Sequence, residues 1–453
     1  MTAEFHSILS RMHPAFLLLL SYILTIILGT CLLMLPLSTV SGSISFIDAL
    51  FTATSSVCVT GLIVVDTGSY FTLFGQGVIL FLIQIGALGI MTISVVLFQI
   101  IGKRLMFKQR MAMQEVFSHA PREDIYSLIR SILIFTVLTE LAGALFLFFY
   151  WDNSYSLPKA AYLSLFHSIS AFCNAGFSLF ADSFVTERAS YTVNITIMAL
   201  IFLGGIGFPV IYEIYARFTD REKWKISIQT RTVLLASIIL VAAGTLVLLI
   251  SQQAMVHELG PGQSLLTALF QSVTCRTAGF NTLDIASLNT AALLFMMFLM
   301  LVGGGPGSCA GGIKITTMAV LAAFSWSRLR RLKCVNLFKR TIPQETVMKS
   351  VSVTLFSVAI IGLVVFLILL TDPHGERAGG NRRFLSYLFE TVSAFGTVGL
   401  TMGITTKLTA FGKTMIIILM LIGRVGVPAF TYILAGVGTT RGIEYAEENM
   451  MIG

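Results

Sequence analysis

One short stretch occurs four times in the chain, and its first copy reads Ser55-Ser56-Val57-Cys58-Val59-Thr60-Gly61-Leu62. The other copies are Ser170-Ala171-Phe172-Cys173-Asn174-Ala175-Gly176-Phe177, Val273-Thr274-Cys275-Arg276-Thr277-Ala278-Gly279-Phe280 and Ser393-Ala394-Phe395-Gly396-Thr397-Val398-Gly399-Leu400. Every copy ends in a small or β-branched residue, then glycine, then Leu or Phe. Successive glycines are 115, 103 and 120 residues apart. This repetition predicts a chain made of four similar units.

A Gly-x-x-Gly pair follows each copy at a nearly constant distance. Its first glycine comes 25, 28, 25 and 24 residues after the glycine of the stretch. The four pairs are Gly86 and Gly89, Gly204 and Gly207, Gly304 and Gly307, and Gly423 and Gly426. Glycine is common in membrane helices, so one such pair would be weak evidence. Two features that keep one spacing through four copies strengthen the prediction of a fourfold repeat.

The composition indicates a polytopic membrane protein. Of the 453 residues, 56% are hydrophobic and 11% are charged, whereas a soluble protein carries roughly 25% charged residues. The net charge is +8, but 18 of the 30 Lys and Arg residues lie in three linkers, at 103–130, 217–231 and 328–349. Lys and Arg near span ends accumulate on the cytoplasmic side, so these linkers are expected inside. This distribution argues against nucleic acid as the partner.

Eight long apolar runs are each long enough to span a bilayer. They are 14–36, 74–100, 129–150, 192–215, 233–251, 289–324, 350–371 and 411–437. A shorter, more polar segment precedes each repeated stretch, at 45–57, 158–172, 262–275 and 381–395. These segments suit re-entrant half-helices that enter from outside. The predicted fold is an all-α polytopic membrane protein with four span–pore-helix–span repeats around one central pore and both termini cytoplasmic. The repeats are expected at 1–101, 102–216, 217–325 and 326–453.

The four repeated stretches are the candidate ion-binding site. Non-helical chain at membrane depth must be buried in protein or line a wet cavity, and each half-helix would direct its partly negative C-terminal end at the shared axis. Backbone carbonyls there could replace the water around an ion. The stretches contain no carboxylate, which favours a large monovalent cation over a divalent one. The expected filter residues are Val59, Thr60, Gly61, Asn174, Ala175, Gly176, Thr277, Ala278, Gly279, Thr397, Val398 and Gly399. The alternative is that these glycines only pack helices together.

A second candidate site interrupts the sixth apolar run. Its glycines and proline are incompatible with a regular helix, because Gly costs ~1 and Pro ~3 kcal/mol relative to Ala in a helix interior. We interpret the break as a flexible intramembrane gate on the cytoplasmic side of the third filter stretch; the alternative is a mere kink. The expected gate residues are Gly303, Gly304, Gly305, Pro306, Gly307, Ser308, Gly311, Gly312 and Lys314. A phosphate-binding loop is excluded, because Lys314 does not directly follow the second glycine and no Ser or Thr comes next.

Some charged residues lie deep in apolar or pore segments, where a charge usually faces a cavity or a partner. Arg424 is expected either to form an electrostatic barrier below the filter or to be tied to loop carbonyls for structure. Arg276 is expected to hold loop carbonyls, since a cation lining the filter would oppose permeation. Glu140 is expected to pair with a pore-helix group, and Lys314 either senses the gate or caps it.

The four stretches and the Gly-x-x-Gly spans resemble the Trk/Ktr/HKT superfamily of potassium transporters over nearly the whole chain. The short N-terminus resembles the bacterial Ktr membrane subunit of the KtrB/KtrD type. The resemblance implies potassium (K+) as the transported ion, because all four filter positions are glycine, and stimulation by sodium (Na+). It implies an intramembrane gate at 303–314, a barrier at Arg424, and a homodimer in the bacterial plasma membrane. It further implies a cytosolic RCK-type ring subunit of the KtrA/KtrC type that carries the nucleotide, ATP/ADP or NAD.

Two other classes of function agree less well with the sequence. An alternating-access carrier for Na+ or K+ often has inverted repeats and broken helices at the midplane. Here the repeats share one orientation and only one span is expected to be broken, which favours a pore. An enzyme is disfavoured, because the six histidines show no metal-like spacing and no nucleophile–base motif stands out.

Overall fold

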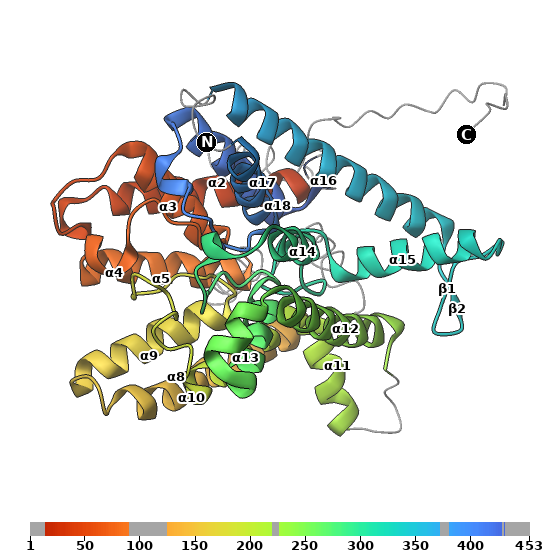
Figure 1. The fold of residues 1–453 in the computed structure, drawn as a ribbon, viewed down its shortest axis with the longest axis horizontal. Coiled ribbons are helices and arrows are strands. Elements are labelled where there is room, and N and C mark those ends of the chain that lie inside the picture. The colour runs from red at the N-terminus through yellow and green to blue at the C-terminus, as the bar shows by residue number, and fades with distance from the viewer. Residues whose placement is uncertain (1–13, 90–124, 220–225, 372–379, 428–429, 431–453) are drawn as a thin grey trace.

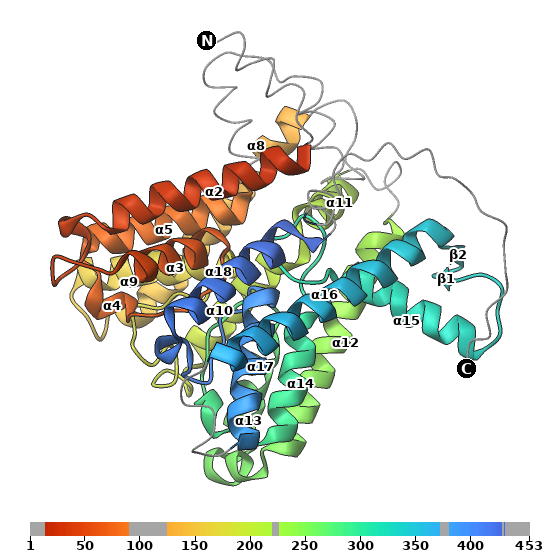
Figure 2. The same ribbon diagram turned by 90° about the horizontal axis from the view of Figure 1, so that it is seen from above.

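The computed structural model describes residues 14–89, 125–219, 226–371, 380–427 and 430 (Figures 1 and 2). The part of the chain that it describes is helical apart from loops and one two-stranded hairpin. The predicted linker 103–130 lies almost entirely outside these residues, as do the two termini, the loop 372–379 and the ends of the runs 74–100 and 411–437.

Within each of the four predicted repeats, the described helices follow one order: a long first helix, a half-helix and a second apolar helix. The first repeat contains α2 (Pro14–Leu33), η1 (Pro36–Ser38), α3 (Phe46–Val57), α4 (Thr67–Tyr70) and α5 (Leu73–Leu88). The second contains α8 (Ile125–Trp151), α9 (Leu157–Phe172), α10 (Tyr191–Ile206) and α11 (Phe208–Thr219). The third contains α12 (Ile228–Ser251), α13 (Gln253–Thr274), η2 (Ile285–Ser287), α14 (Thr290–Leu301) and α15 (Ile315–Leu329). The fourth follows the hairpin β1 (Asn336–Leu337) and β2 (Arg340–Thr341), and contains α16 (Gln344–Thr371), α17 (Gly380–Gly396), η3 (Thr405–Lys407) and α18 (Ala410–Val425).

The half-helices α3, α9, α13 and α17 agree closely with the four short polar segments predicted from the sequence. The match for α13 begins after a kink, because Gly260 has a φ of 75° and Pro261 follows it. The second helix of every repeat begins at a residue whose side chain accepts a hydrogen bond from a backbone N–H three residues on. These N-caps are Thr72, Ser190, Asn289 and Thr409. Capping of this kind satisfies a donor that the first helical turn leaves free.

The repeats close into a ring through one recurring contact. The second helix of each repeat packs against the half-helix of the next: α5 on α9, α10 on α13, α14 on α17, and α18 back on α3. Figure 1 shows the resulting arrangement, in which the helices of the first and last repeats lie side by side although they are far apart in the sequence. The half-helices therefore converge on a common centre.

The structure corrects the prediction that only one span is broken. The run 192–215 forms two helices, α10 and α11, which meet at 93° across Gly207. Gly207 has a φ of 96°, a conformation that glycine adopts without the strain of a Cβ. The run 289–324 is broken as expected, between α14 and α15.

Three described helices are long and apolar enough to cross a membrane, and the bent pair α10–α11 would be a fourth. The three are the first helices of repeats two, three and four: Ile129–Trp151, Ile228–Ser251 and Gln344–Thr371. The second helices are shorter, with 12 to 16 residues, because they stop at or before the second glycine of their Gly-x-x-Gly pair. The helices thus confirm an apolar membrane-type fold, while the number of eight spans stays a prediction.

Candidate ion pathway

Four glycines, one from each repeated stretch, form a closed ring at the centre of the fold. We call Gly61, Gly176, Gly279 and Gly399 the glycine ring. A Cβ placed on any of them would come closer than 3.0 Å to a carbonyl oxygen of the next member's stretch: Ala175, Ala278, Val398 and Thr60, in that order. The fourth contact returns to the first stretch, so the four stretches form a closed circle. At each contact the backbone of one stretch lies so close to the next that only glycine fits. The structure thus brings together residues that are up to 338 positions apart in the chain.

The backbone alternates in handedness through each stretch. The ring glycines have φ values of 88°, 69°, 80° and 94°, and the residues two before them, Val59, Asn174, Thr277 and Thr397, have φ values of 56°, 58°, 70° and 50°. The residue between each pair does not have a positive φ. The sign of φ therefore alternates in all four stretches, which distinguishes their backbone from both a helix and a strand. Positive φ at non-glycine residues costs of order 1 kcal/mol or more and persists only where the surroundings fix it.

Serine side chains fix three of the four stretches from behind. The backbone N–H of Gly61 donates to Ser55 Oγ and that of Gly399 donates to Ser393 Oγ, both at 3.1 Å. In the second stretch, Ser170 Oγ instead donates to the carbonyl of Phe177 at 2.8 Å. The third stretch has Val273 at the same position and lacks this support. The third repeat therefore departs from the other three beside the glycine ring.

The Gly-x-x-Gly pairs have two different physical roles, which the sequence pattern alone did not reveal. A Cβ on Gly86, Gly204 or Gly423 would overlap the carbonyl at the C-terminal end of the half-helix in the same repeat. These carbonyls belong to Val57, Phe172 and Phe395. The second glycines all have positive φ, and those of repeats one, two and four are the residues at which the helix ends. The first glycine thus permits close packing behind the ring, and the second ends the helix.

The predicted gate is an extended, non-helical loop whose ends pair with each other, since Gly303 N–H donates to the Ile313 carbonyl at 2.8 Å. The loop contacts the fourth stretch: a Cβ on Gly311 would overlap the side chain of Thr397, and one on Gly312 would lie 3.3 Å from Gly396 Cα. The apolar run is thus interrupted, and the interrupting chain lies against the fourth repeated stretch. Whether the loop gates the pathway stays a prediction.

Hydrogen bonds tie this loop to two other repeats. Gly305 N–H donates to the carbonyl of Gly205 at 2.9 Å, and Phe208 N–H donates to the carbonyl of Gly307 at 3.1 Å. Gly312 N–H donates to the carbonyl of Gly423 at 3.2 Å. The loop is therefore held by the break between α10 and α11 on one side and by α18 on the other.

Arg424 completes this network from the end of α18. Its guanidinium donates to the carbonyls of Cys309 in the loop and Gly86 at the end of α5, and more distantly to Ala87 at 3.5 Å. One side chain thus joins the fourth repeat to the loop of the third and to the first. Of its two predicted roles, the contacts favour the tie to loop carbonyls, and the barrier role stays a prediction.

Comparison with known proteins identifies the family. The TrkH family, described as a cation transport protein, matches residues 6–437 of this chain. The chain belongs to this family.

Its relatives agree with the resemblance seen in the sequence. Ktr system potassium uptake protein B of Bacillus subtilis is 40% identical over 428 residues, covering 94% of each chain. Potassium/sodium uptake protein NtpJ of Enterococcus hirae is 35% identical over 450 residues, covering 98% of each. The crystal structure of the potassium transporter TrkH from Vibrio parahaemolyticus matches with a TM-score of 0.70 over 93% of this chain and 85% of that one. At 19% identity, this last match concerns the fold alone.

The remaining buried charges behave in three ways. Glu140, 6% exposed, accepts from Gln84 Nε2 of α5 at 3.1 Å, so its main partner is not the predicted pore-helix group; Cys173 Sγ, at the C-cap of half-helix α9, donates to it more weakly at 3.8 Å. Lys314 Nζ donates to the carbonyl of Ala310 at 2.6 Å and therefore caps the loop. Arg276 was wrongly expected to hold loop carbonyls. Within the described residues its guanidinium makes no such hydrogen bond, and its Nε is buried without a partner.

Two buried ionisable residues lie behind the ring, each nine positions before its glycine, and no sequence motif singles them out. His167, fully buried, lies 3.1 Å from Ser178 Oγ, and Glu390, 1% exposed, accepts from Thr401 Oγ1 at 2.9 Å. Ser178 and Thr401 both lie two positions after a ring glycine. Aligning the four repeats would have revealed the pair, because the same offset holds uncharged Thr52 and Phe270 in repeats one and three.

Proposed function

We propose that this chain is the channel-like, potassium-translocating membrane subunit of a Ktr-type uptake system. The observation that carries the proposal is the glycine ring, in which four backbone stretches of one polypeptide meet around a common centre. Four span–pore-helix–span repeats and eight membrane spans are part of the proposal. The filter would consist of the twelve residues predicted from the sequence, three from each stretch.

Potassium is proposed as the ion for two reasons. The stretches supply backbone carbonyls and no carboxylate, which suits a monovalent cation that loses its water cheaply. The relatives are named as potassium uptake proteins, and one as a potassium/sodium uptake protein. Stimulation by sodium belongs to the proposal as well.

The loop at 303–314 is proposed as the gate, and Arg424 as the residue that holds it or opposes ions below the filter. The loop contacts the fourth stretch directly and is tied to repeats two and four, so a shift in either would move it. Regulation would come from a cytosolic RCK-type ring subunit that binds the nucleotide, acting on a homodimer of this chain. Both termini and the basic linkers would face the cytoplasm of a bacterial cell.

An alternating-access carrier is the second candidate. The observation in its favour is the break between α10 and α11, because broken helices near a binding site are typical of such carriers. Two observations favour the pore instead. All four half-helices end at one glycine ring. The break between α10 and α11 and the break between α14 and α15 are joined by the hydrogen bond from Gly305 N–H to the Gly205 carbonyl.

The test is potassium-tracer uptake in a bacterium that lacks its own potassium uptake, expressing this chain with and without a ring subunit. Wild type should restore growth at limiting potassium, and Gly61→Asp should reduce uptake to background, because its side chain would enter the ring. Gly42→Asp is the matched control: Gly42 also has a positive φ, 74°, but nothing lies within 4 Å of its Cβ position. No uptake of potassium or rubidium by correctly inserted wild type under either condition would refute the proposal.

A further inference from the structure

Two cavities lie next to each other where α11, α12, α15 and the β1–β2 hairpin meet. One is apolar, with a volume of about 480 Å³, and the other is polar, about 230 Å³. Neither touches the glycine ring or the residues proposed for the filter. We call them the apolar crevice and the arginine cavity.

The arginine cavity gathers three guanidinium-bearing residues from three separate elements. Arg217 comes from the end of α11, Arg231 from the first turn of α12, and Arg340 from β2. Glu213, one turn before Arg217, accepts hydrogen bonds from Ser227 and Thr230 and does not line the cavity. Guanidinium groups bind phosphate through paired hydrogen bonds, so the cavity has the chemistry of a phosphate site.

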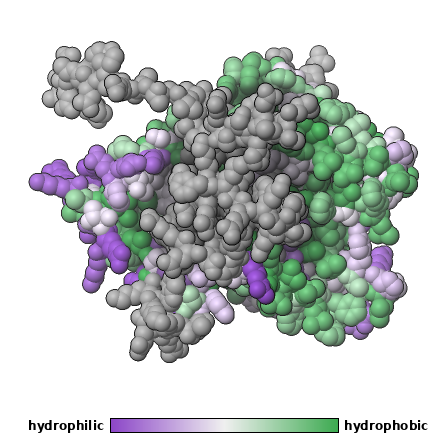
Figure 3. All heavy atoms as spheres, turned by 180° about the vertical axis from the view of Figure 1, so that it is seen from behind, coloured by the Kyte–Doolittle hydropathy of each residue, from purple (hydrophilic) through white to green (hydrophobic). Residues whose placement is uncertain are grey.

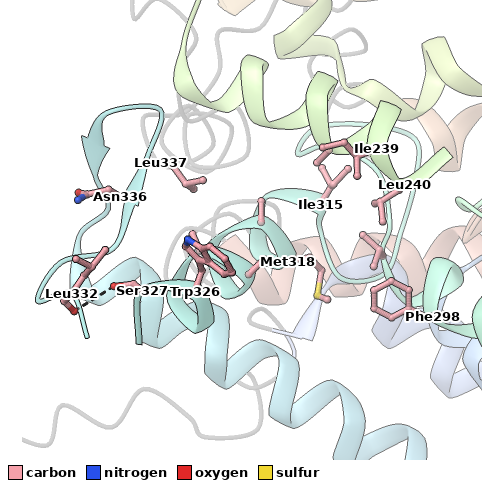
Figure 4. A pocket seen from close by; sticks show the side chains of 15 residues that line it. Ile239, Leu240, Phe298, Ile315, Met318, Trp326, Ser327, Leu332, Asn336 and Leu337 are labelled. Atoms are coloured by element: carbon pink, nitrogen blue, oxygen red, sulfur yellow. Dashed lines mark hydrogen bonds between the residues drawn. The ribbon is translucent and has the colours of Figure 1, made fainter. Parts of the chain in front are cut away.

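The apolar crevice has the opposite character. Figure 4 shows Ile239 and Leu240 of α12 on one side, Met318 and Trp326 of α15 on the other, and Leu337 of the hairpin near its end. Trp326 is 56% exposed and Ile239 is 55% exposed. Figure 3 shows that hydrophilic side chains gather at the edge of the molecule to which the hairpin belongs, beside a hydrophobic surface. The crevice could therefore accommodate a hydrocarbon chain.

The two cavities share two walls. On α12, Arg231 and Ala236 line one cavity each, and five residues of helix correspond to about 7.5 Å. On the hairpin, Leu337 lines the crevice and its neighbour Phe338 lines the arginine cavity. One amphipathic molecule with a phosphate head and a hydrocarbon tail could fill both.

The hairpin wall is built into the fold and is not a loose loop. Ile342 N–H donates to the carbonyl of Val335 at 2.8 Å, and Ser327 Oγ donates to that of Cys334 at 3.0 Å. Val335 packs in a small core with Val320 of α15 and Val347 of α16. The hairpin that carries Arg340 is thereby held against α15 and α16.

We propose that this composite site binds one anionic phospholipid of the inner leaflet, with its phosphate among the three arginines and an acyl chain in the apolar crevice. The charge of the cavity and the apolar character of the crevice match the two halves of such a lipid. All three arginines belong to segments that the sequence places on the cytoplasmic side, where basic pockets recognise anionic headgroups.

The site adjoins both ends of the gate loop. Val302, directly before the loop, and Ile315, directly after it, line the apolar crevice, and Val302 pairs with Ile313 in an isolated bridge. An acyl chain in the crevice would hold α12 against α15 and so fix the positions from which the loop starts and ends. Bound lipid is therefore expected to favour one state of the loop; this consequence rests on the proposed function.

The experiment measures thermal unfolding of the full chain in detergent while phosphatidylglycerol or phosphatidylcholine is added. Phosphatidylglycerol should raise the unfolding temperature of wild type, since a ligand of the folded state stabilises it. The double variant Arg231→Gln/Arg340→Gln should need at least about fivefold more lipid, because two of three phosphate partners are lost. The control Arg331→Gln/Lys339→Gln removes equal charge from residues that line neither cavity, and should respond like wild type. Ala322→Trp, whose side chain would fill the apolar crevice, should also reduce the rise in unfolding temperature caused by phosphatidylglycerol. If Ala322→Trp does not fold, Ala236→Leu replaces it as the variant that fills the crevice.

Three results would overturn the proposal. An equal loss of response in the arginine variant and its control would reduce the effect to general surface charge. A full response with inorganic phosphate alone would make the site one for a free anion. An unchanged lipid response in the arginine variant would show that the arginines do not bind the lipid, and would point to another partner, such as an acidic protein surface. The unfolding temperature reports lipid binding whether or not the chain transports potassium. The proposed function is tested separately, by tracer flux in phosphatidylglycerol vesicles, so the two proposals can fail independently.

Discussion

The glycine ring and the loop at 303–314 are both non-helical chain inside a helical protein, but they are built in opposite ways. The ring is built by repetition: four stretches adopt the same alternating backbone, and each excludes a side chain from its neighbour. The loop is built by exception: within the part of the chain that the structure describes, only the third repeat interrupts its second helix with a long glycine-rich segment. Each ring glycine lies against a carbonyl of the next stretch, whereas the loop forms hydrogen bonds with repeats two and four. The comparison teaches that repetition brings four equivalent stretches into contact with one another, whereas the single element links two other repeats.

The largest expected effect concerns the packing that supports the ring. Gly86→Ala should destabilise the protein by about 1–3 kcal/mol or more, because the new Cβ would overlap the carbonyl of Val57. Gly77→Ala lies on the same helix with nothing within 4 Å of its Cβ position, and should stabilise by roughly 0.5–1 kcal/mol. Thermal unfolding of both variants in detergent checks this, and equal shifts would show that the support of the ring is not rigid.

An intermediate effect is expected at the loop. Arg424→Gln should raise potassium flux several-fold and weaken dependence on a ring subunit, since it removes the tie between Cys309 and Gly86. Arg424→Lys separates the two proposed roles. It keeps the charge but cannot reproduce the planar fork that reaches both carbonyls. If Arg424→Lys has the same flux as Arg424→Gln, the hydrogen-bonded tie is the role of Arg424. If it has the same flux as wild type, the role is that of an electrostatic barrier.

The smallest expected effect concerns the buried residues behind the ring. Glu390→Gln keeps the shape but weakens the hydrogen bonds from Thr401 and Thr405, and should lower the potassium preference over sodium by about two- to threefold. Thr401→Val should act in the same direction. Thr414→Val, whose hydroxyl donates only to the carbonyl of Ala410, is the control and should leave selectivity unchanged. Competition of sodium with rubidium-tracer uptake measures this preference.

The sequence could predict the ring because its signal is local and repeated four times. The half-helices and the non-helical loop were likewise predictable from polarity and glycine content, whereas the main partner of Glu140, Gln84 of α5, was not. The bend at Gly207 was not, because an apolar run of ordinary length hides a change of direction that depends on one φ angle. The environment of Arg276 was also missed, since only the surrounding fold decides which acceptors a guanidinium can reach. His167 and Glu390 needed an alignment of repeats, because neither belongs to a motif.

The most direct measurement is the selectivity between potassium and sodium of Gly279→Ala beside Gly403→Ala. Both glycines have a φ of 80°, so an alanine is strained equally at both positions. A Cβ at Gly279 would overlap the ring carbonyl of Val398, whereas nothing lies within 4 Å at Gly403. We expect Gly279→Ala to lose most of the potassium preference and Gly403→Ala to keep it. Unchanged selectivity in Gly279→Ala, with protein inserted at normal levels, would show that ions do not pass through the glycine ring.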